Sequence, residues 1–208
     1  ITVTSKVQER LTFCVYTTGT GNNCTTKSGT AVTLGDDNGV LYPTGPFVDK
    51  SAKFSVSTNS TGSAIVRVKG PTLTSGGNTI TSIGGTPTSV VGGGTEQFGF
   101  CAYESAASTP AMSIQTTYDG ASGVPAGECA GTSQTAGTNT TGGQGTGAEF
   151  AYDTNTTDGT GSTYGDLLAT KPAGDFSTVT MSFIGNISNS TEAGIYTTTL
   201  TFIATGTY

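Results

Sequence analysis

Few side chains in this sequence could do chemistry, and histidine is missing altogether. Without histidine, Ser-His-Asp and Cys-His machinery cannot form, and the commonest general base is lost. The 14 Asp and Glu residues leave room for a carboxylate pair of the kind that glycosidases use. Most of these acids lie in polar turn sequences such as GDDNG (35–39), where solvated charges explain them. We therefore expect no catalytic residues and no enzyme, with a carboxylate hydrolase as the alternative.

Two oxygen-rich loops raise the question of a bound metal. GDDNG (35–39) and YDTNTTDGTG (152–161) carry the oxygen ligands that calcium prefers, but neither fits the EF-hand spacing. The sequence has no CxxC pair for zinc, and GGG at 92–94 is not followed by the Lys-Ser or Lys-Thr of a phosphate loop. We therefore expect no metal and no cofactor.

The 4 cysteines point to an oxidising compartment. Cys14 lies close in sequence to Cys24, and Cys101 lies close to Cys129. We predict these two local disulfides from proximity alone, since four cysteines allow three connectivities. Four buried free thiols are the alternative.

Six N-x-[ST] sequons could accept glycans if the protein is exported. Abundant Thr and Ser supply many such matches by chance, and O-linked sugars are equally compatible with the loops. The six asparagines are Asn23, Asn59, Asn139, Asn155, Asn186 and Asn189.

The composition favours an all-β protein outside the cell. Only 11% of residues are charged, against about 25% in typical domains, and Thr, Ser and Gly fill the difference. The net charge is −6, without a basic patch for nucleic acid or anionic lipid. No apolar run approaches the roughly 20 residues of a membrane helix. A start at Ile1 instead of methionine favours a removed signal peptide, with trimming as the alternative.

A long amphipathic strand opens the chain at ITVTSKVQERLTFCVY (1–16). Apolar residues occupy one face and Thr, Lys, Gln and Arg the other, with Glu9 as an exception on the apolar face. Strand sequences recur after it. We expect a short strand at 30–35, a hairpin at 52–58 and 63–70 turning at NSTG (59–62), and a second hairpin at 176–188 and 194–208.

About ten such strands predict an antiparallel β-sandwich, jelly-roll-like or immunoglobulin-like in layout. Residues 120–147 contain almost nothing that a core could use, so we expect one domain with a long Gly/Thr-rich loop there. The alternative is two domains joined by this stretch, because long structureless loops are uncommon.

Four stretches together resemble secreted bacterial all-β surface proteins, including fibre subunits of the TasA and camelysin type. They are SAKFSVSTNSTGSAIVRVKG (51–70), TLTSGGNTITSIG (72–84), TEQFGF (95–100) and YTTTLTFIATGTY (196–208). The resemblance implies an exposed protein that assembles into filaments by donating an N-terminal strand to the next subunit. In this sequence residues 1–13 match that role, and residues 14–208 would form the receiving sandwich.

The physical chemistry of strand donation is independent of that resemblance. An extended segment completes a neighbour's sheet through main-chain hydrogen bonds, and its alternate side chains fill pockets. The pocket-filling residues would be Ile1, Val3, Val7 and Leu11. We therefore expect a homopolymeric structural subunit at the cell surface, with a biofilm scaffold among its possible uses. The alternatives are a strand that pairs within its own subunit and a monomeric adhesin or carbohydrate-binding module.

Overall fold

Strands make up the regular structure of this computed structural model, which describes residues 1–90, 93–119, 140–141, 149–153 and 164–207. No helix occurs among these residues, so the all-β expectation is confirmed for them. In chain order the strands are β1 (Leu11–Tyr16), β2 (Phe47–Asp49), β3 (Lys53–Lys69), β4 (Thr74–Ser75), β5 (Asn78–Thr79), β6 (Gly84–Ser89), β7 (Gln97–Ala106), β8 (Ser113–Ile114), β9 (Thr140–Thr141), β10 (Glu149–Tyr152), β11 (Asp166–Asn186) and β12 (Thr201–Thr207).

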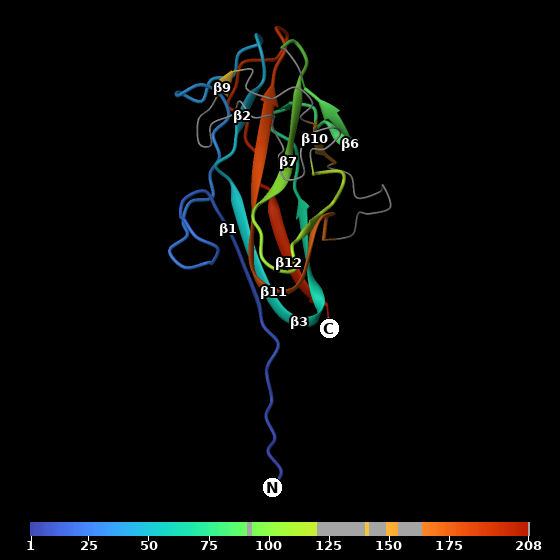
Figure 1. Cartoon of the computed structure of the whole chain (residues 1–208). Coiled ribbons are helices and arrows are strands. Elements are labelled where there is room, and N and C mark those ends of the chain that lie inside the picture. The colour runs from blue at the N-terminus through green and yellow to red at the C-terminus, as the bar shows by residue number, and fades with distance from the viewer. Residues whose placement is uncertain (91–92, 120–139, 142–148, 154–163, 208) are drawn as a thin grey trace.

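One large antiparallel sheet contains ten of these strands, and β4 and β5 form a small separate sheet. The main path of the large sheet is β1-β3-β11-β7-β10-β6, with β12 also on β3, and β2 and β8 on β11 (Figure 1). Most of the loop expected at 120–147 lies outside the described residues, and within it Thr140 and Thr141 form β9, which pairs with β2.

The two long strands β3 and β11 replace the first predicted hairpin. β3 runs unbroken through NSTG (59–62), and both of its halves pair with β11: Phe54 lies opposite Val179, and Val68 lies opposite Asp166. Register shifts around Gly174 let the paired strands bend together, as bulges do. Figure 1 shows β3 curving at the lower end of the molecule. NSTG is therefore a bend within one strand, because β11 supplies partners on both sides of it.

The second predicted hairpin is also absent. β11 and β12 do not pair with each other in the described structure, and both pair with β3, on opposite edges of its second half. The short strand expected at residues 30–35 is absent. Regular pairing at the N-terminus begins only at Leu11, so the strand expected over residues 1–16 is much shorter.

Apolar side chains from both faces of the central strands form the core. On β7, Phe98 and Phe100 belong to the larger buried cluster, whereas Cys101, which follows Phe100 and lies on the opposite face of the strand, belongs to a smaller one. The Phe100 ring stacks on Tyr118 with centroids 4.8 Å apart and lies 5.2 Å from the ring of Phe183. β7 is thus covered on both faces, which explains its dense run of aromatic and small residues.

The core and the N-terminal segment make different contributions to the free energy of unfolding. A Val→Ala substitution in each of them measures the difference. Val56 is fully buried, whereas Val7 is 81% exposed. We expect Val56→Ala to lower the free energy of unfolding by about 2 kcal/mol, because the buried methyl groups and their packing are lost. Val7→Ala is the matched control and should leave it unchanged. Urea titration followed by circular dichroism measures both, and equal losses would contradict this division.

Candidate assembly site

Residues 1–10, which we call the tail, extend away from the sheet without joining a strand (Figure 1). The exposed fractions of Ile1, Val3 and Val7 are 124%, 87% and 81%. Exposed apolar residues at alternate positions are costly in water and mark an interaction site more often than isolated ones do. Glu9, which the alternation had left unexplained, is exposed as well.

Leu11 is separated by the fold from the other three predicted pocket-filling residues. It opens β1, lies opposite Thr58 on β3, and packs half-buried against the larger core cluster. Strand β1 is further tied down by the Cys14–Cys24 disulfide, which confirms that predicted pair. The segment that is available to a partner therefore ends at Arg10.

Asn59 fixes the point at which the tail leaves the sheet. Its side-chain Oδ1 accepts the backbone N–H of Arg10 at 2.5 Å, and its Nδ2 donates to the carbonyl of Gln8 at 2.9 Å. The backbone N–H of Asn59 donates to the carbonyl of Arg10 at 3.2 Å. These bonds satisfy the last tail groups at the bend of β3 and direct the rest of the tail outward.

The tail cannot continue along β3 because β12 already lies there. Extending the β1 register one residue at a time would place Lys6 opposite Ser63. In the structure Thr207 lies opposite Ser63, and its Oγ1 donates to the Ser63 carbonyl at 2.9 Å. Gly62 approaches the Thr207 carbonyl so closely that any side chain there would clash. The edge of β3 is thus shared end to end by β1 and β12.

The tail and β12 have matching patterns for that edge. In the extended register Ile1 would lie opposite Val68, where Phe202 now lies, and Val3 opposite Val66, where Ala204 lies. Ser5 would correspond to Gly206. The tail and β12 therefore both place two apolar residues and then a small one along this edge of β3. The tail therefore has the sequence of an edge strand of this fold, while its position in its own subunit is occupied.

The remaining predicted cysteines and sequons are placed as follows. Cys101 is fully buried and disulfide-bonded, and its predicted partner Cys129 lies outside the described residues. Asn23, Asn59 and Asn189 are exposed, whereas Asn186 is only 2% exposed at the end of β11. Asn139 and Asn155 lie outside the described residues.

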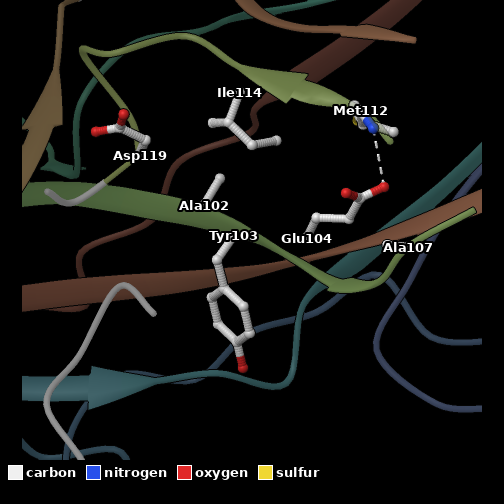
Figure 2. Close-up of a pocket in the computed structure, with 7 residues that line it drawn as sticks. All are labelled: Ala102, Tyr103, Glu104, Ala107, Met112, Ile114 and Asp119. Atoms are coloured by element: carbon white, nitrogen blue, oxygen red, sulfur yellow. Dashed lines mark hydrogen bonds between the residues drawn. The ribbon is translucent and has the colours of Figure 1, made fainter. Parts of the chain in front are cut away.

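A shallow hollow of about 370 Å³ beside β7 contains two carboxylates, Glu104 and Asp119 (Figure 2). Figure 2 shows them on different walls, pointing in different directions. Glu104 Oε1 accepts the backbone N–H of Met112 at 3.0 Å, so this carboxylate holds the neighbouring chain in place.

The carboxylate of Asp36 accepts hydrogen bonds from groups within its own turn. Oδ1 accepts the N–H groups of Asn38 and Val40 at 2.8 and 3.0 Å, and Oδ2 accepts the Tyr42 hydroxyl at 2.8 Å. These bonds, with that of Val40 foremost, lower the pKa of Asp36.

Within the described ranges no three His, Cys, Asp or Glu side chains gather to hold a metal. In that same part of the chain, no helix is long and apolar enough to cross a membrane.

Sequence reasoning missed a buried lysine in β11. Lys171 is fully buried, and its ammonium donates to the carbonyls of Pro110 and Pro172 at 2.9 and 3.0 Å. Desolvation lowers its pKa, against the opposing charges of Glu104 and Asp175. Its hydrogen bond to the Pro110 carbonyl fastens the loop after β7 to β11 near the bend.

The roles of Asn59 and β12 were also missed by sequence reasoning. For β12 there was a readable signal, because ITVTSK (1–6) resembles FIATGT (202–207).

Asn59 offers a direct test of the tail anchor. We expect Asn59→Ala to speed hydrogen exchange at the Arg10 amide, because that N–H loses its acceptor, while global stability falls by about 1 kcal/mol or less. Asn189→Ala, at an exposed turn, is the control and should not change it. Amide exchange followed by NMR reports both, and unchanged exchange at Arg10 in Asn59→Ala would contradict the anchor.

Comparison with family models, with curated proteins and with solved structures found no match to this chain.

Proposed function

We propose that this protein is the structural subunit of an extracellular filament and that residues 1–10 join it to the next copy by strand complementation. The observation that carries the proposal is an apolar tail, patterned as an edge strand, whose place on its own sheet is taken by β12. A strand that cannot close within its subunit remains available to another one. In this proposal the protein is not an enzyme and needs no cofactor.

The bent pair of β3 and β11 supports a sandwich of the jelly-roll-like or immunoglobulin-like kind as the receiving body. In β-augmentation the main chain of the added strand supplies the hydrogen bonds, and alternate side chains supply the fit. Burial of each of Ile1, Val3 and Val7 would contribute roughly 1.5–3 kcal/mol before the cost of ordering the tail. Because the donor and the receiving edge are different surfaces, the contact does not close and repeats as a filament.

Several features suit such an assembly outside the cell. The Cys14–Cys24 disulfide is typical of oxidising compartments. Exposed sequons at Asn23 and Asn189 leave the surface open to covalent glycans. A cell-surface polymer, with a biofilm scaffold as one use, is consistent with both.

Removal of the tail should abolish polymers and leave a folded monomer. Residues 1–10 contribute nothing to the buried core, so the variant that lacks them should keep the circular dichroism spectrum of the full chain. Light scattering after size exclusion, with negative-stain microscopy, measures the assembly. Polymers of undiminished length in this variant would refute strand donation, and a monomeric full chain that binds glycans would favour the adhesin alternative.

A pair of point variants tests the face of the tail that matters. Val3→Asp should reduce polymerisation strongly, because strand addition would bury its carboxylate without a partner. Thr4→Asp adds the same charge on the opposite face and should have a much smaller effect. Sedimentation of polymers at matched protein concentration compares them. Equal inhibition by the two variants would show that charge, and not the apolar face, controls assembly.

A further inference from the structure

The connection between β11 and β12 contains a second segment that is patterned as a strand but incompletely paired. We propose that residues 194–200 of a second copy are the surface that receives the tail, an inference that rests on the proposed function. The tail of one subunit would lie along this segment of the next and cover its exposed apolar side chains.

Residues 194–200 have little regular strand pairing with the rest of the described chain. Tyr196, Thr198 and Leu200 are half-buried, whereas the alternate residues are exposed, which is the period of a strand. In the described structure this segment has a single bridge, between Thr197 and Thr74, with N–H to carbonyl distances of 2.9 and 3.0 Å. Other contacts hold the same side of the segment to the domain: the Thr198 hydroxyl donates to the Pro71 carbonyl at 2.5 Å, and the Thr199 carbonyl lies close to Gly70. Regular strand pairing on that side is limited to the Thr197–Thr74 bridge, and the proposal gives the tail the opposite side.

Exposed apolar side chains single out the same segment. The described chain has seven large apolar side chains that are strongly exposed, and only four of them exceed 80%. Three of the four are in the tail, and the fourth is Ile195 at 86%. The other three, Val40, Tyr42 and Tyr164, are 42–58% exposed. Joining the tail to Ile195 would cover the most exposed apolar groups of both copies in one contact.

The two segments lie at opposite ends of the molecule. Figure 1 shows the tail leaving at the lower end and the connection after β11 at the upper end. A contact between opposite ends adds subunits in one direction, as a filament requires. Ten extended residues span roughly 33 Å, which is longer than the roughly 23 Å of residues 194–200. The tail can therefore pair with the whole segment and still reach its own β1.

Charge favours the same partnership. The tail carries Lys6 and Arg10 against Glu9, whereas the whole chain has a net charge of −6. Glu192 is exposed two residues before Gly194, and Glu96 accepts the hydroxyl of Thr191, the residue before Glu192, at 2.7 Å. A basic strand approaching an acidic end associates faster, and salt screens that advantage.

Substitution of Ile195 tests the receiving surface without disturbing the fold, because this side chain is almost fully exposed. We expect Ile195→Asp to raise the protein concentration needed for polymerisation roughly tenfold or more, since an apolar contact is lost and a carboxylate is added beside Glu192. Tyr164→Asp is the control, with the same new charge at another exposed apolar position, and should polymerise normally. Polymerisation of Ile195→Asp at the normal concentration would overturn the assignment.

Cross-linking between two differently tagged copies identifies the neighbour directly. All described cysteines are in disulfides, so an engineered thiol is the reactive one. A short bismaleimide should join Val3→Cys on one copy to Ile195→Cys on the other, and should join Val3→Cys to Tyr164→Cys far less.

The outcomes separate this inference from the proposed function. If tail-dependent polymers form but Val3→Cys does not cross-link to Ile195→Cys, the receiving surface is wrong and strand donation stands. If the full chain forms no polymer and no cross-link appears, both are refuted.

Discussion

A strand edge can pair with only one strand at a time, because each backbone N–H and C=O on that edge points to a single neighbour. The second half of β3 makes this constraint decisive in the present protein. One of its edges is paired with β11 and the other with β12. The tail, which would reach the second edge by extending β1, has no backbone partner left there. Its exposure follows from this occupancy and not from any lack of strand character.

The tail is held firmly at its base, although the rest of it is exposed. Asn59 binds the backbone of Arg10 and Gln8 at the bend of β3, and β1 is held by its pairing with β3 and by the Cys14–Cys24 disulfide. In the proposed assembly, a tail fixed at its base would lose less orientational freedom on binding than one on a long linker. The domain thus presents an extended apolar strand from a firm support, while the buried cluster around Phe100 forms independently of it.

The bend shared by β3 and β11 sets the layout of the rest. Because β11 follows both halves of β3, the strand partners of the N-terminal and C-terminal segments meet on one continuous edge. Lys171 and Gly174 lie in β11 near this bend, where the Lys171 ammonium donates to the carbonyl of Pro110 in the loop after β7 and to that of Pro172 in β11 itself. Burial of a cation is costly, and the two hydrogen bonds, with the charges of Glu104 and Asp175, offset part of that cost. The bend also separates the tail from the connection before β12, at the other end of the molecule.

We could predict from the sequence the all-β class, the local Cys14–Cys24 bridge, the faces of the central strands and the apolar pattern of the tail. These depend on alternation, composition and nearby residues, which are local properties. The pairing of the strands could not be predicted in this way. Alternation assigns a face but not a partner, so it predicted hairpins for NSTG (59–62) and for the C-terminal strands, where long-range pairing with β11 and β3 prevails. For the same reason, the start of β1 at Leu11 could not be predicted from the sequence. That boundary depends on β12, which is nearly two hundred residues away.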